Sequence, residues 1–285
     1  MAQRACFKLI TVALLLLVAR PSVSDDSKTS IEIGIAPFLS VYTLVQNYAP
    51  LVKHLESRLK IPVSIVSAPD YKTFYERIRK RAYPFIITPA NSAYLAWSES
   101  SYVPMLKPLI HSRPVVVVTN NSNFSRLDDL RNKTISMSDP LAMTSMQGMQ
   151  QLQEAGLLQG RDITIINMPN HSVAVNLLLA GEVSAAIVSD RAILQMPAAI
   201  KEKIKVVYTW DKSADPGVIY LANPNLSKKL REQISAAIYD YYKNTPDGIE
   251  QINEMGYGGL VTVTSGELKH LAPYGELLKK ALAKM

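Results

Sequence analysis

Cysteine is almost absent from this 285-residue chain, and histidine is scarce. The only cysteine, Cys6, precedes an apolar run instead of following it, so it does not mark a lipoprotein attachment site. Beyond it the chain has no thiol nucleophile, no disulfide and no cysteine-based metal site. The four histidines lie far apart with no second ligand four residues away, so we predict no metal and no cofactor.

Motifs that carry catalytic chemistry are also missing. The chain has no G-x-S-x-G elbow, no Walker loop and no G-x-G-x-x-G fingerprint. The glycine-rich stretch "GYGGL" at 256–260 is not followed by Lys-Ser/Thr, so it indicates a turn after a helix and not a phosphate loop. We therefore predict a binding protein and not an enzyme.

Neither sign of charge is concentrated in the sequence. The full chain has a formal net charge of +7, from 31 basic and 24 acidic residues. Removing Arg4, Lys8 and Arg20 with an N-terminal leader leaves 28 basic residues and a net charge of +4. The basic residues are scattered, so nucleic acid is not a predicted partner.

Only one long apolar run is present, at the N-terminus. Leu9–Ala19 contains 11 residues, whereas a helix that spans a bilayer needs roughly 20. Basic residues precede the run, and small residues follow at the spacing that signal peptidase accepts. This pattern predicts a signal peptide over residues 1–24, cleaved near Ser24, and a periplasmic protein. An N-terminal anchor helix is the alternative.

Strand and helix patterns alternate through the rest of the chain. Apolar, strand-like segments occur at 31–38, 61–69, 83–90, 113–121 and 204–210. Repeated βαβ units predict an α/β fold of mixed, mainly parallel sheets flanked by helices. We expect two lobes joined by two hinge strands, with 31–112 and 211–285 in lobe 1 and 113–210 in lobe 2. One continuous doubly wound sheet is the alternative.

Four segments resemble those of a known family. They are "IGIAPF", "APLVKHLESRLKIPVSIVSAPDY", "NHSVAVNLLLAGEVSAAIVSD" and "NLSKKLREQISAAIYDYYKNTPDGIEQINEMGYGGL". In order and spacing they resemble the periplasmic solute-binding proteins of phosphate, phosphite and phosphonate ABC importers. The resemblance implies a monomeric receptor that closes on a small-molecule ligand and delivers it to inner-membrane transporter subunits. A sensor that signals to a membrane kinase is the alternative.

The resemblance also implies ligand contacts at individual positions. The family's tyrosine after "APD" is present as Tyr71, and its histidine before a helix of the second lobe is present as His171. A strand that ends with an aromatic residue in relatives ends here with Thr88 and Pro89. An aromatic wall is therefore lost there, although Ser92 follows in the next helix.

The family's phosphonate clamp is altered in this chain. Its Ser-Thr-Ser-Gly pattern after Asp-Pro corresponds to Ala142, Met143, Thr144 and Ser145, and a register slip of one residue recovers two hydroxyls. An acidic residue that is usual after "GEV" is Ser184 here. A buried oxyanion needs several donors, so these changes reduce the supply of hydrogen bonds.

Methionine is concentrated around this clamp, and two interpretations of it stay open. Met143, Met146 and Met149 have near-helical spacing, so they could pack the helix against its own lobe. Methionine also suits surfaces that adapt to a bulky apolar ligand.

Two ligand hypotheses follow. In the first, a small phosphorus oxyanion lies between four residues: Tyr71, Thr144, Ser145 and His171. In the second, which the lost polar groups slightly favour, a lipid- or sterol-like molecule contacts Ala142, Met143 and Met146. One polar residue, either Tyr71, Thr88, Ser92 or His171, then orients the polar end of that molecule.

Overall fold

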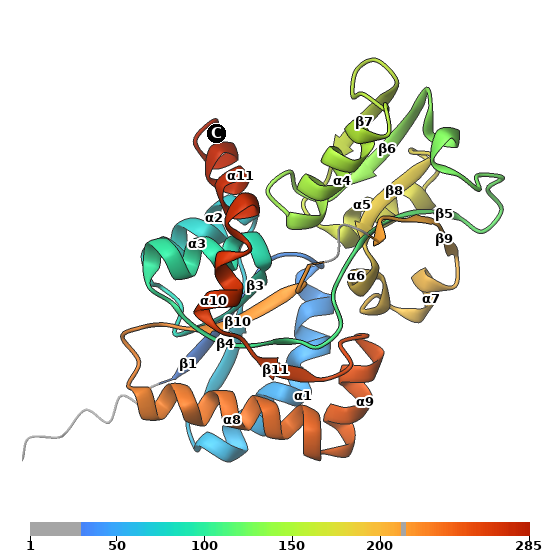
Figure 1. Ribbon diagram of the computed structural model, residues 1–285. Helices are drawn as coiled ribbons and strands as arrows, with labels where there is room; N and C mark the ends of the chain where they lie inside the picture. Colours follow the sequence, from blue (N-terminus) through green and yellow to red (C-terminus); the bar gives the residue numbers. More distant parts are fainter. Residues whose placement is uncertain (1–29, 212–214) are drawn as a thin grey trace, which may run out of the picture.

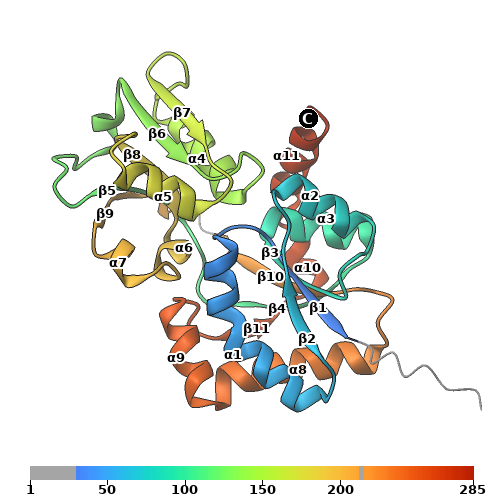
Figure 2. The same ribbon diagram turned by 180° about the vertical axis from the view of Figure 1, so that it is seen from behind.

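The computed structural model describes residues 30–211 and 215–285, which form two lobes (Figures 1 and 2). Each lobe has its own β-sheet, so the alternative of one continuous sheet is wrong and the two-lobed α/β fold is confirmed. The expected signal peptide, residues 1–24, lies outside the described residues. Within the described ranges, no helix has both the length and the apolar character needed to cross a membrane.

The first lobe contains a six-stranded sheet in the order β11-β4-β10-β3-β1-β2. Its strands are β1 (Ile31–Ile35), β2 (Val63–Val66), β3 (Phe85–Pro89), β4 (Val103–Pro108), β10 (Val218–Ala222) and β11 (Leu260–Thr262). β1 pairs in parallel with β2 and β3, whereas β10 runs antiparallel between β3 and β4. The sequence patterns did not predict β4, which contains two prolines and a lysine, or β11, which has only three residues.

Seven helices are described in the first lobe. They are α1 (Val41–Leu59), α2 (Tyr71–Arg79), α3 (Ala90–Ser100), α8 (Lys228–Asn244), α9 (Pro246–Glu254), α10 (Ser265–Lys269) and α11 (Ala272–Leu282). Side chains cap the starts of α1 and α2: Ser40 accepts from Thr43 N–H, and Asp70 accepts from Thr73 N–H. These caps fix where both helices begin, and α2 consequently starts with Tyr71.

The second lobe contains a five-stranded sheet in the order β7-β6-β8-β5-β9. Its elements are β5 (Pro114–Thr119), the 3₁₀ turn Leu127–Leu130, β6 (Lys133–Met137), α4 (Met143–Glu154), β7 (Ile163–Asn167), α5 (His171–Leu179), β8 (Ala185–Ser189), α6 (Asp190–Leu194), α7 (Ala198–Lys201) and β9 (Ile204–Thr209). β6 pairs in parallel with β7 and β8, and β5 runs antiparallel between β8 and β9. The single reversed strand, β5, is the one that enters directly from the first lobe.

The chain passes between the lobes twice, just before β5 and just before β10. The two crossing segments pair with each other, because Ser112 N–H donates to the Asp215 carbonyl at 2.8 Å and Asp215 N–H donates to the Ser112 carbonyl at 2.9 Å. The strands themselves lie inside the two sheets, so the connection between lobes is shorter than the predicted hinge strands. The lobe boundaries at residues 112/113 and 210/211 stay a prediction. The sheets support it, because β4 and β10 belong to the first sheet whereas β5 and β9 belong to the second.

The hydrophobic core shows that the lobes are packed together. One cluster of buried residues extends from the first lobe to Leu141, Ala142 and Ala174 of the second. On β5, Val115 and Val117 belong to this cluster, while the alternate residues of the strand face a separate core within the second lobe. The structure therefore represents a conformation in which the lobes are closed on each other.

Candidate ligand-binding cleft

A small cavity lies between the lobes, next to the crossing segments. Both lobes line it, and five of the predicted site residues are among its lining: Tyr71, Ala142, Met143, Thr144 and His171. The volume of the cavity is about 40 Å³. That is on the order of three or four water molecules.

The other predicted residues do not line this cavity. Thr88 and Ser92 are buried within the first lobe, in β3 and α3. The Ser145 hydroxyl donates to a main-chain carbonyl of its own lobe at 3.1 Å. The Met146 sulfur accepts a hydrogen bond from Asn91 Nδ2 of the first lobe at 3.6 Å.

Four long helices begin at the cavity, besides the short helix α6, whose N-cap Ser189 also lines it. Tyr71 is the first residue of α2, and His171 is the first residue of α5. Met143 is the first residue of α4, whose N-cap is Ala142, and Pro89 is the N-cap of α3. Ala142 makes no side-chain cap, so the first N–H groups of α4 have no capping oxygen from that residue. Pro89 makes no cap either, but at the start of α3 Ala90 N–H donates to the Gly217 carbonyl at 3.2 Å and Ser92 N–H donates to Asn91 Oδ1 at 2.8 Å. Together these helix starts favour negative charge in the cavity.

Local packing sets the position of the first turn of α4. Asp139 forms the turn before the helix, because its carboxylate accepts from Leu141 N–H at 2.8 Å. Further along, Gly148 lets the helix lie close to its sheet. A Cβ at this position would lie 2.9 Å from Met137 Cε and 3.0 Å from Ile187 Cγ2. The turn and the close approach together hold Ala142 and Met143 at the cavity.

Tyr71 and His171 are neutral polar groups in the cleft. Burial lowers the pKa of His171 to about 4, so its imidazole is uncharged at neutral pH. Its Nδ1 atom has no hydrogen-bond partner within the described part of the chain. Burial, with a smaller contribution from the negative charge of Asp139, raises the pKa of Tyr71 well above its ordinary value, so the phenol keeps its proton. Both side chains are able to donate to a ligand oxygen without adding charge.

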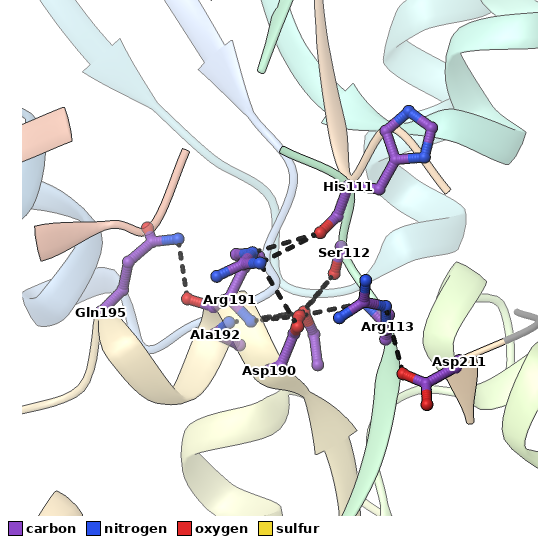
Figure 3. A network of polar contacts seen from close by, with 9 residues as sticks. His111, Ser112, Arg113, Asp190, Arg191, Ala192, Gln195 and Asp211 are labelled. Carbon is purple, nitrogen blue, oxygen red and sulfur yellow. Dashed lines mark hydrogen bonds and ion pairs between the residues drawn. The ribbon is translucent and has the colours of Figure 1, made fainter. Parts of the chain in front are cut away.

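Sequence reasoning missed the cavity residues that lie near the crossing segments. Ser112, Ser189, Arg191 and Asp215 all line the cavity. The Ser112 and Ser189 hydroxyl oxygens are 2.7 Å apart. Arg191 donates to the His111 carbonyl from Nε at 3.3 Å and from Nη2 at 3.2 Å (Figure 3). These residues come from three distant segments, namely the two crossing segments and the end of β8, which meet only through strand pairing, so no local pattern indicated them.

Two carboxylates lie in this part of the cleft. The Asp190 carboxylate accepts from Arg113 N–H at 3.0 Å and lies 3.7 Å from Arg191 Nη2 (Figure 3). Asp215 is buried, and its carboxylate accepts from Gly217 N–H at 2.5 Å. Burial, and to a smaller extent the charge of Asp190, raises the pKa of Asp215 to about 7. The protonated form of Asp215 is therefore much more favoured near neutral pH than that of an ordinary aspartate.

Comparisons with known proteins agree with this geometry. The family model described as "ABC transporter, phosphonate, periplasmic substrate-binding protein" matches residues 33–268. The chain belongs to this family. It is thus a periplasmic substrate-binding protein of an ABC transporter, and such proteins bind substrates for transport and interact with membrane transporter subunits. A comparison with curated proteins finds no match.

Solved structures share the fold of this binding protein at low sequence identity. A binding protein component of an ABC phosphonate transporter from Pseudomonas aeruginosa has a TM-score of 0.73 at 14% identity, covering 90% of this chain and 96% of its own. PhnD1 from Prochlorococcus marinus, in complex with methylphosphonate, has a TM-score of 0.74 at 13% identity, with 88% and 98% covered. The alkanesulfonate-binding protein SsuA from Xanthomonas axonopodis pv. citri, bound to MOPS, has a TM-score of 0.62 at 15% identity, with 88% and 92% covered. These similarities establish the two-lobed fold.

Proposed function

We propose that this binding protein captures a small phosphorus oxyanion between its lobes and delivers it to a membrane importer after export as a monomer. The observation that carries the proposal is the convergence of four helix N-termini on one small cavity. The uncapped start of α4 is the main site, because a ligand oxygen there would take the place of the missing capping side chain. Tyr71, Thr144 and His171 are the side chains that would complete the set of donors.

The residues that stand in place of the family's hydroxyl groups favour one class of oxyanion over another. Ala142 and Met143 line the cavity together with Phe38, Ala192 and Val218, which are also apolar. These groups cannot hydrogen-bond to oxygen, but they can contact a short alkyl substituent. The proposal therefore places an alkylphosphonate, with methylphosphonate as the smallest example, ahead of inorganic phosphate.

The lipid- or sterol-like ligand that the sequence slightly favoured has less support. Pockets for drug-sized ligands enclose roughly 300–1,000 Å³, far more than the cavity of about 40 Å³ in the closed form. Met146 also lies outside the cavity lining, and its sulfur accepts a hydrogen bond from Asn91. One of the methionines that suggested an apolar ligand therefore does not line this cavity.

Calorimetry tests the proposal. Phosphate, phosphite, methylphosphonate and a lipid extract are titrated separately into the purified protein. The proposal predicts micromolar or tighter binding of at least one oxyanion, weakened by Thr144→Ala. Binding of lipid alone, or co-purification of a lipid that is lost in the Ala142→Ser, Met143→Ser double variant, would contradict it.

A further inference from the structure

A buried asparagine connects the lobes beside the cavity. Asn91, the second residue of α3, has no exposed surface. Its Nδ2 atom donates to the Leu141 carbonyl at 3.0 Å and to the Met146 sulfur at 3.6 Å, both in the second lobe. Its Oδ1 atom accepts from Ser92 N–H at 2.8 Å, so the amide is held in place within its own lobe. The donor of the amide is therefore used entirely between lobes.

A second asparagine makes a matching contact from a different helix. Asn47 lies in α1 of the first lobe, and its Nδ2 atom donates to the Gln195 carbonyl of the second lobe at 3.1 Å. The carbonyl of Asn47 accepts from the Gln251 side chain of α9. Gln195 also donates from Nε2 to the Tyr257 hydroxyl of the first lobe at 3.2 Å. Both asparagines thus donate to main-chain carbonyls across the gap between the lobes.

Neither asparagine lines the ligand cavity, but their acceptors lie next to its lining. Leu141 immediately precedes Ala142, and Gln195 is itself a lining residue. A ligand in the cavity therefore has no direct contact with Asn47 or Asn91. Their hydrogen bonds form only when the lobes come together. When the lobes separate, the two Nδ2 donors are hydrated by water instead.

We propose that Asn47 and Asn91 are positioning residues that hold the two lobes closed around the cavity. This inference rests on the two-lobed fold, and it uses the proposed function only for the choice of a ligand probe. Met146 supports the bond of Asn91 by offering a second acceptor, which accounts for a methionine in the first turns of α4. Loss of one such hydrogen bond lowers the closed population about 2- to 10-fold relative to the open population.

The test compares Asn47→Ala and Asn91→Ala with Asn176→Ala, which changes an exposed asparagine on α5. Stopped-flow kinetics with methylphosphonate and with phosphate should show dissociation about 2- to 10-fold faster in the first two variants. Association rates should stay unchanged, because association starts from the open form. Replacing a residue that only stabilises its own lobe would not raise the dissociation rate while leaving the association rate unchanged.

A second readout needs no ligand. Spin labels at Glu76→Cys on α2 and Thr164→Cys on β7, in a Cys6→Ser background, report the distance between the lobes in the full chain. Both asparagine variants should lose short distances relative to wild type. If no phosphorus oxyanion binds, the proposed ligand is wrong and this distribution alone decides the role of the asparagines. Identical distributions in wild type and both variants, or identical dissociation rates where a probe binds, would overturn the inference.

A milder pair of variants tests the inference if the alanine variants do not fold. Met146→Leu keeps the volume of the side chain and removes only the sulfur acceptor, whereas Met149→Leu makes the same change without a hydrogen bond to Asn91. Met146→Leu should shift the lobe distances in the same direction as Asn91→Ala, by less than twofold in population. Equal effects of the two leucine variants would count against the role of Asn91.

Discussion

Protonation of Asp215 should control how strongly the cleft binds an anion. The carboxyl group is buried in the cavity lining and has a pKa of about 7, because burial disfavours its charged form. When it is protonated, it is neutral and able to donate to a ligand oxygen. When it is ionised, its charge repels the ligand. Oxyanion affinity should therefore fall as pH rises through 7.

The size of this effect follows from the pKa. If only the protonated form binds, the dissociation constant rises about 30-fold between pH 6 and pH 8.5, which corresponds to about 2 kcal/mol. His171 does not contribute in this range, because its pKa is about 4. The affinity of Asp215→Asn should depend little on pH after correction for the ionisation of the ligand itself. That ionisation changes the affinity of both proteins by the same factor. Calorimetry with methylphosphonate at pH 6 and pH 8.5 makes the comparison, and equal profiles for the two proteins would refute the reasoning.

Two further predictions concern the stability of the first lobe and the start of α4. Gly34→Ala should lower the free energy of unfolding by about 1–3 kcal/mol, because the new Cβ would lie 2.6 Å from the Tyr83 ring. Urea unfolding measures this change, and Gly266→Ala is the matched control, because its new Cβ would lie 3.7 Å from the nearest atom, Thr264 Oγ1. Thr144→Val should weaken oxyanion binding about tenfold or more, because it removes a hydroxyl that lines the cavity. Ser145→Ala removes a hydroxyl that is hydrogen-bonded inside the second lobe. This variant should lower the thermal midpoint and leave the affinity for the oxyanion unchanged. A larger affinity loss in Ser145→Ala than in Thr144→Val would show that the register of the clamp has been assigned wrongly.

The sequence identified those parts of the cleft that follow a strand–helix pattern. Tyr71 and His171 follow Asp70 and Asn170, whose side chains cap the helices, so local signals place both residues at helix starts near the carboxyl ends of strands. Family resemblance then added their role. The two-lobed organisation was predictable for the same reason, because it depends on alternating apolar segments.

Residues whose position depends on long-range pairing could not be predicted in this way. Asp215 enters the cavity because its segment pairs with Ser112, about one hundred residues earlier in the chain. Met146 has the helical spacing of a packing residue, and the sequence offers no sign that its sulfur would meet Asn91 of the other lobe. The family resemblance suggested Thr88 as a ligand contact, yet Thr88 does not line the cavity, whereas its neighbour Pro89 does.

A crystal structure of the protein with methylphosphonate would test the central claim most directly. The account predicts closed lobes with a phosphonate oxygen within hydrogen-bond distance of the main-chain N–H groups of Met143 or Thr144. It also predicts that the methyl group faces the apolar side of the cavity, near Phe38 and Val218. A phosphonate bound elsewhere, or a cleft filled by a lipid in place of the oxyanion, would contradict the account.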